Sequence, residues 1–97
     1  MSQVIIESNN SWRLVGELSF VTAGNLLTEI TNKISSLDSN ELTIDLSEVD
    51  NTDSAGLALL IELFRTNISI TFCNIPKRIL NLSAVGGVKD LLMNKGA

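Results

Sequence analysis

The sequence predicts an α/β fold: a mixed sheet of four to five strands, packed with three to four helices. Two observations support this prediction. Short apolar runs alternate with longer segments of helical spacing, in the order hairpin, helix, strand, helix, strand, helix. Strands separated by a helix are joined by right-handed crossovers and lie parallel, whereas an N-terminal hairpin adds one antiparallel pair. The 97 residues are expected to form a single domain, 1–97.

The N-terminal hairpin is predicted by two apolar runs, residues 4–7 and 12–15. Between them lies Ser8-Asn9-Asn10-Ser11, a cluster of turn-forming residues. Gly16 and Glu17 are expected to close the second strand. Trp12, the only tryptophan, is expected to lie in the core.

A first amphipathic helix follows the hairpin. Thr22 is a plausible N-cap, because a side-chain oxygen at this position can accept from the free N–H groups of the first turn. Apolar residues then recur at three- and four-residue spacing, which is typical of one buried stripe. They are Leu26, Leu27, Ile30, Ile34 and Leu37.

The middle of the chain predicts a buried strand over 42–46, mostly apolar and bounded by polar residues. A polar loop is expected over 47–53 and a second helix over 54–65. A further strand over 68–72 alternates with β-branched residues. The two strands should be parallel.

The remaining chain predicts a third helix and a short final element. Pro76 suits the first turn of a helix, where its missing N–H has no partner to lose. Gly86-Gly87 should end this helix. The final element is expected over 88–93, and residues 94–97 are expected to fray.

Composition and charge exclude several functions. Seven basic and eleven acidic residues give a net charge of −4, so nucleic-acid binding is disfavoured. The chain has no histidine and one cysteine, Cys73, which removes the usual catalytic pairs, a disulfide and a metal cluster. The longest apolar run, 57–61, is too short to span a membrane, and the N-terminus lacks a secretory signal. We therefore expect a soluble, cytoplasmic protein without cofactor, metal or direct membrane insertion.

The second helix is unusually apolar on both sides. A helical wheel directs one group toward the sheet: Leu57, Leu60, Ile61 and Phe64. The opposite group is Ala55, Ala58, Leu59 and Glu62. A surface helix normally carries more charge there, so this face is expected to dock on another protein, with Leu59 as the anchor. The alternative is that a small domain simply tolerates one exposed leucine.

The start of this helix carries Asp53 and Ser54, either of which could cap it. Gly56 is unfavourable within the first turn, and one reason to place it there is the close approach of another backbone. The carboxylates of Asp45, Asp50 and Asp53 could serve acid/base chemistry or Mg²⁺. Aspartate is also common in turns for local hydrogen bonds, and no nucleophile–base pair accompanies these three, so we expect no catalytic residues.

The stretch 44–60, with its Asp-Ser-Ala-Gly-Leu turn between a strand and a leucine-rich helix, resembles the signature of the STAS family. The similarity is closest to the stand-alone MlaB-type subunits. It implies a non-enzymatic cytoplasmic subunit that binds and regulates the MlaF-like ATPase of an ABC transporter, which moves phospholipids to maintain outer-membrane lipid asymmetry. Attachment to the inner membrane would come only through this partner. With the helix face above, the expected partner-binding residues are Asp53, Ser54, Ala55, Ala58, Leu59 and Glu62.

Another branch of the family, the anti-sigma factor antagonists, provides the alternative function. The resemblance implies binding to a kinase-like anti-sigma factor and phosphorylation of a serine immediately before the motif glycine. Here that position is Ala55, so only Ser54 remains as a candidate for phosphorylation. An Asp-Ser pair at a helix start also occurs in acyl carrier proteins, but the strands predicted near residues 42 and 68 contradict an all-helical carrier.

Overall fold

Four strands and four helices follow one another along residues 2–93, the part of the chain that the computed structural model describes. The prediction for 94–97 lies outside these residues. The order of the elements agrees with the predicted α/β class. The elements are β1 (Gln3–Ser8), β2 (Ser11–Leu18), α1 (Ala23–Ile34), β3 (Glu41–Thr52), α2 (Ser54–Leu63), β4 (Ser69–Cys73), α3 (Lys77–Val85) and α4 (Lys89–Met93).

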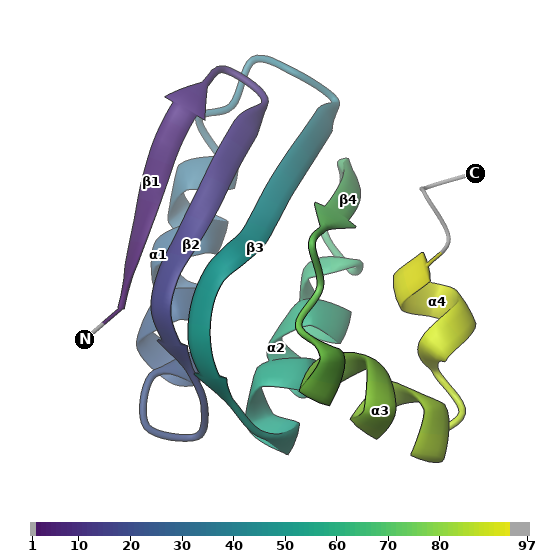
Figure 1. Cartoon of the computed structure of the whole chain (residues 1–97). Coiled ribbons are helices and arrows are strands. Elements are labelled where there is room, and N and C mark those ends of the chain that lie inside the picture. Colours follow the sequence, from purple (N-terminus) through teal and green to yellow (C-terminus); the bar gives the residue numbers. More distant parts are fainter. Residues whose placement is uncertain (1, 94–97) are drawn as a thin grey trace.

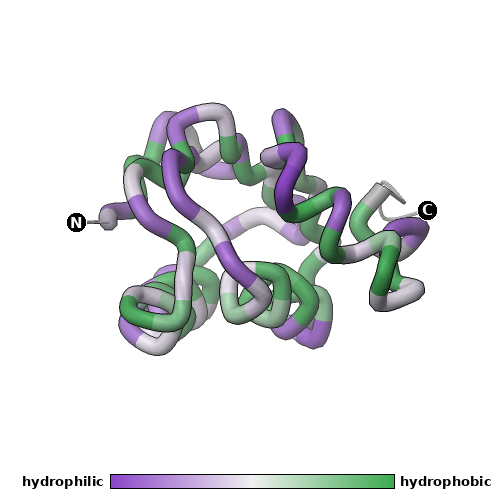
Figure 2. The backbone as a smooth tube through the Cα atoms, turned by 60° about the horizontal axis from the view of Figure 1, so that its bottom comes forward, coloured by the Kyte–Doolittle hydropathy of each residue, from purple (hydrophilic) through white to green (hydrophobic). Residues whose placement is uncertain are grey.

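The strands form one mixed sheet in the order β1-β2-β3-β4 (Figure 1). β1 and β2 are the antiparallel hairpin, whereas β2–β3 and β3–β4 are parallel, as predicted. Trp12 of β2 lies beside Ile44 of β3, which lies beside Phe72 of β4. These three positions place large apolar side chains in one row across the sheet. Helices α1 and α2 form a second layer over one face (Figure 2).

The core lies between the sheet and this helical layer. In β2, the buried Trp12, Leu14 and Leu18 alternate with half-buried residues, so one face of the strand points to the helices. Trp12 is 1% exposed, which confirms its predicted place in the core. The helices contribute the buried leucines and isoleucines of the other side: Leu26, Ile30, Leu57, Leu59, Leu60, Leu63, Ile79 and Leu92.

The predicted loop over 47–53 is wrong, because β3 continues to Thr52. The extension pairs with the end of β2, where Val15 lies opposite Glu48 and Leu18 opposite Thr52. Register shifts interrupt this pairing, and Gly16 adopts a φ of 96° within the irregular stretch. Pairing with β2 gives the backbone of the polar residues 47–52 hydrogen-bond partners, while most of their side chains remain accessible to solvent. This pairing outweighs the weak preference of these residues for strands.

The ends of the helices follow the predictions within a few residues. Thr22 precedes α1 as predicted, but its side chain makes no cap bond; its hydroxyl donates instead to the carbonyl of Glu17 at 2.9 Å. α2 ends at Leu63 rather than residue 65, and Pro76 stands immediately before α3. None of the helices within residues 2–93 has the length and hydropathy needed to cross a membrane.

Candidate functional site

The first turn of α2 is held by the carboxylate of Asp53. One oxygen, Oδ1, accepts from the backbone N–H groups of Ala55 at 2.9 Å and Gly56 at 3.3 Å. The other, Oδ2, accepts from the backbone N–H of Phe20 at 3.1 Å. These bonds favour the ionised form, so the pKa of Asp53 is lowered, first by the Phe20 N–H. Of the two predicted capping residues, Asp53 is therefore the N-cap.

The same turn is pressed against the end of β2. A side-chain carbon built on Gly56 would overlap the carbonyl oxygen of Leu18. The predicted close approach of another backbone is confirmed, and that backbone belongs to the chain itself. The glycine and the aspartate together join the start of α2 to the β2–α1 connection.

A shallow groove of about 360 Å³ runs between α1 and α2. Most of its lining side chains are small or apolar, and among the residues that line it, only Glu62 is charged. This side chain lies 3.8 Å from Arg65 in an exposed ion pair. The groove is lined by Ala23, Gly24, Leu27, Ala55, Ala58, Leu59 and Glu62.

Four of the six residues predicted to bind a partner line this groove, and the other two begin the helix beside it. Ser54, Ala58 and Glu62 are exposed, whereas Asp53 and Ala55 are half-buried. The prediction that Leu59 is an exposed anchor is wrong, because its side chain is only 3% exposed and forms the floor of the groove.

The burial of Leu59 has a simple cause. α2 packs against α1 and α3 as well as β3. More of its circumference is therefore buried than in a helix that contacts a sheet alone. Leu63 is fully buried within this larger buried surface, while Ile61 and Phe64, which the helical wheel directed to the sheet, are only half-buried. The outer face of α2 is thus narrower than predicted, and Ala58 lies at its centre.

The structure reveals two apolar side chains that the sequence interpretation missed. Phe20 and Val21 are 83% and 79% exposed in the loop between β2 and α1. Phe20 is tied by its backbone to Asp53, so this loop adjoins the start of α2. The available signal was the occurrence of two bulky apolar residues between Ser19 and Thr22, outside any strand or helix periodicity.

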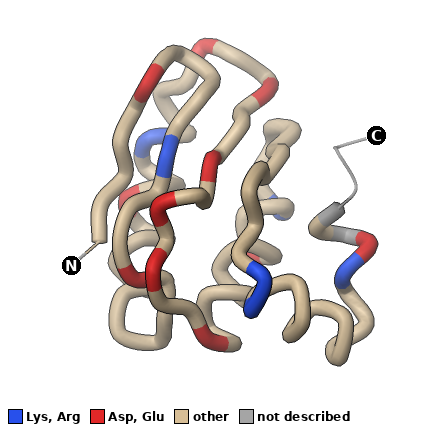
Figure 3. Tube along the Cα trace, in the orientation of Figure 1, with Lys and Arg blue, Asp and Glu red and all other residues tan. Residues whose placement is uncertain are grey.

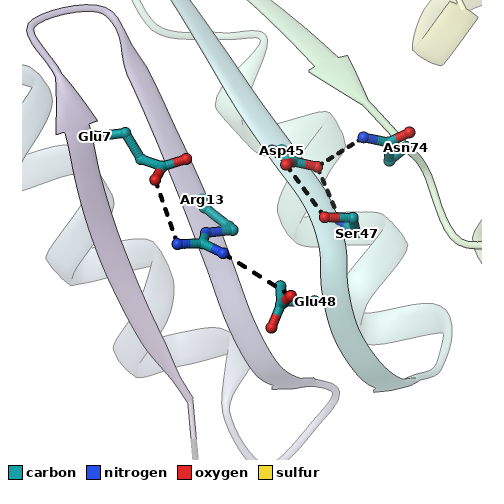
Figure 4. Close-up of polar contacts among 6 residues, drawn as sticks. All are labelled: Glu7, Arg13, Asp45, Ser47, Glu48 and Asn74. Carbon is teal, nitrogen blue, oxygen red and sulfur yellow. Dashed lines mark hydrogen bonds and ion pairs between the residues drawn. The ribbon is translucent and has the colours of Figure 1, made fainter.

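The three aspartates considered for catalysis have separate places in the fold: Asp45 and Asp50 lie on β3, whereas Asp53 caps α2. Asp45 accepts from the Asn74 side-chain amide at 3.0 Å and from Ser47, and these bonds, that of Asn74 first, lower its pKa (Figure 4). Asp50 is exposed at the end of β3. Within residues 2–93, no three His, Cys, Asp or Glu side chains gather as metal ligands.

Arg13 forms a second polar group on the sheet. Its guanidinium lies 3.3 Å from Glu7 and 3.9 Å from Glu48 (Figure 4). Acidic residues predominate along β1, β2 and β3 (Figure 3). The ion pairs of Arg13 with Glu7 and Glu48 are partly exposed, so they contribute little to the stability of the fold.

Comparisons with known proteins agree with this architecture. The STAS domain family model matches residues 4–95. A structure of the anti-sigma factor antagonist SpoIIAA in its unphosphorylated form is similar with a TM-score of 0.69 and 14% identity, covering 92% of this chain and 83% of that one. A crystal structure of Mglu is similar with a TM-score of 0.57 and 22% identity, covering 78% of this chain and 20% of that one.

At these identities the two structures establish the fold rather than an activity. No curated protein matches the chain significantly. The family model, by contrast, spans nearly the whole sequence, including the Asp53 cap and Gly56. The chain therefore belongs to the STAS domain family.

Proposed function

We propose that the chain is a non-enzymatic subunit that docks on the MlaF-like ATPase of an ABC transporter and regulates it. The transporter would move phospholipids to maintain outer-membrane lipid asymmetry. One observation carries the docking part of the proposal: the exposed start of α2 continues into a groove of small and apolar side chains with a single carboxylate. The MlaB-like resemblance of residues 44–60 supports the choice of partner.

Small side chains suit this role physically. Ala55, Ala58 and Gly24 allow a partner's backbone or side chains to approach α1 and α2 closely. The Asp53 cap already fixes the first turn of α2. Because this surface needs little further ordering when it binds, the entropic cost of association is reduced. A subunit that binds one ATPase conformation tenfold better than another favours that conformation by about 1.4 kcal/mol. The chain would lie in the cytoplasm and reach the inner membrane only through the ATPase.

The test uses the purified chain and the purified ATPase subunit. Ala58→Glu places a charge on the exposed centre of the outer face of α2, and Ala84→Glu makes the same change on the exposed side of α3. We expect Ala58→Glu to weaken binding at least tenfold and Ala84→Glu to leave it unchanged. Wild-type affinity in Ala58→Glu would exclude this surface, and no binding by the wild-type chain would exclude the partner.

The alternative function, an anti-sigma factor antagonist, is favoured by the structural similarity to SpoIIAA. It would use the same surface but a serine-kinase anti-sigma factor as partner. Ser54 is the exposed hydroxyl at the start of α2, and a phosphate there would gain from the helix dipole. Incubation with such a kinase and ATP, followed by intact mass measurement, separates the two functions. Stoichiometric phosphate that is lost in Ser54→Ala would favour this alternative and count against the transporter subunit.

A further inference from the structure

A buried hydrogen-bond donor in the core has no acceptor. Trp12 is 1% exposed, and its indole Nε1 has no hydrogen-bond partner among the described residues. The indole nitrogen can only donate, so only a group with a lone pair can satisfy it. Because an unpaired buried donor costs free energy, such donors are nearly always paired in proteins. The Trp12 donor therefore calls for an acceptor from outside the chain.

Trp12 also lines a hollow of about 290 Å³ at one end of the molecule. This hollow lies between the β1–β2 hairpin and the end of α1, which Figure 1 shows at the same end of the fold. It shares no lining residue with the α1–α2 groove, so it is separate from the candidate docking surface. Its other lining residues are Ile6, Ser8, Asn9, Lys33, Ser36, Leu37 and Asp38.

The hydroxyl groups of the hollow already donate within the chain. Ser8 donates to the side-chain oxygen of Asn10 at 3.4 Å, and Ser36 donates to the carbonyl of Lys33 at 3.2 Å. Both hydroxyl oxygens keep lone pairs, and the exposed carboxylate of Asp38 can only accept when it is ionised. A ligand that satisfies Trp12 with an oxygen can thus also use N–H groups of its own.

The charges of the hollow disfavour an ionised ligand. Lys33 and Asp38 are the only charged residues in its lining, and their charges are opposite. The ammonium of Lys33 already lies 3.9 Å from Glu29, and the nearby C-terminal end of α1 carries a partial negative charge, so a carboxylate would gain little here. An ammonium group has no lone pair and cannot accept from Trp12.

We propose that this hollow binds a small uncharged organic molecule that carries a carboxamide. The Trp12 N–H donates to the amide oxygen, and the amide N–H groups donate to the acceptors at Ser36 and Asp38. A short apolar part of the molecule packs against Ile6 and Leu37. A carboxamide fits because it accepts and donates hydrogen bonds without carrying a charge. The inference is independent of the proposed docking on an ATPase.

The experiment follows the indole N–H of the ¹⁵N-labelled full chain by NMR. Trp12 is the only tryptophan, so its indole gives a single signal. The probes are 4-methylpentanamide and the carboxylate and amine of the same skeleton. We expect a saturable downfield shift of the indole proton with the amide, and at least tenfold weaker binding of the two charged probes. No saturable shift with the amide, or equal or tighter binding of a charged probe, would overturn the inference; the first result would leave Trp12 paired with water only.

Two neighbouring serines test the location. Ser36→Phe places a ring in the lining of the hollow, whereas Ser35→Phe makes the same change at an exposed residue that does not line it. We expect Ser36→Phe to weaken amide binding at least tenfold and Ser35→Phe to change it less than twofold. Equal affinity in the two variants would exclude this hollow as the binding site.

The role of the donor is tested by Trp12→Phe, which removes the N–H and keeps an aromatic ring. Binding is then measured by saturation transfer to the amide probe, and circular dichroism checks that the variant is folded. We expect at least tenfold weaker binding, and wild-type affinity would refute the hydrogen bond. Since Trp12 belongs to the core, the exposed Ser36 and Ser35 variants decide the outcome if Trp12→Phe does not fold.

Discussion

The carbonyl oxygen of Leu18 occupies the space that a side chain on residue 56 would need. Only glycine therefore lets the first turn of α2 rest against the end of β2. The contact joins residues that lie far apart in the sequence, and it sets the position of the helix whose exposed start is the candidate docking surface.

Gly56→Ala should destabilise the protein by about 2–3 kcal/mol, because the overlapping atom belongs to backbone that cannot move without disturbing the sheet. This strain exceeds the roughly 1 kcal/mol that alanine normally gains over glycine in a helix. Urea unfolding measures the change through the fluorescence of Trp12, the only tryptophan, which is buried.

Gly24→Ala is the matched control for this substitution. Residue 24 also lies in the first turn of a helix, but a side-chain carbon there meets nothing within 4 Å. We expect a gain of up to about 1 kcal/mol from helix propensity. Equal effects at the two glycines would contradict the Leu18 contact.

Leu59→Ala should cost about 2–4 kcal/mol, because the side chain is buried and its loss leaves a cavity beneath the groove. Ala58→Glu, one residue earlier but exposed, should change stability by less than about 0.5 kcal/mol. Both are measured by urea unfolding. If Leu59→Ala lowered the free energy of unfolding no more than Ala58→Glu, the burial of Leu59 would be contradicted.

Acid should weaken the fold partly through Asp53. Its pKa is lowered in the folded state, so the unfolded state binds more protons between the two pKa values. The stabilisation is therefore complete above the unfolded pKa of about 3.9 and is lost as pH falls through the lower, folded value. Urea midpoints measured from about pH 6 to about pH 2 should fall less steeply in Asp53→Asn than in the wild type.

Asp45 is the internal comparison for this acid effect, because its pKa is also lowered, first by the Asn74 amide. Asp45→Asn should remove its own share of the acid sensitivity and leave that of Asp53. A wild-type pH profile in Asp53→Asn would show that the hydrogen bonds from Phe20, Ala55 and Gly56 do not favour the charged carboxylate.

The thiol of Cys73 should react slowly at neutral pH. Burial raises its pKa, and the nearby carboxylate of Asp45 raises it further, so little thiolate is present. The rate of reaction with a disulfide reagent should therefore rise at a higher pH than for a cysteine in an unfolded peptide. Asp45→Asn should shift the profile part of the way back, because burial remains; a shift to higher pH would contradict the effect of the carboxylate.

Local patterns in the sequence were sufficient to predict most elements and to narrow the cap of α2 to Asp53 or Ser54, between which the structure decided. The turn residues between 8 and 11, the stripe containing Leu26 and Ile30, and Asp53 before the second helix act over one or two turns of chain. Such short-range preferences can be read directly from residue order. The parallel β3–β4 pair followed from the intervening helix.

Three features depended on contacts between distant parts of the chain. β3 extends to Thr52 because the end of β2 supplies its partners, and Leu59 is buried because α1 and α3 flank α2. Phe20 and Val21 are exposed in a loop whose backbone is hydrogen-bonded to Asp53, more than thirty residues later. Residue order reveals which side chains prefer burial. Which of them are buried is decided by the packing of whole elements, because the same helix face is buried or exposed according to the elements beside it.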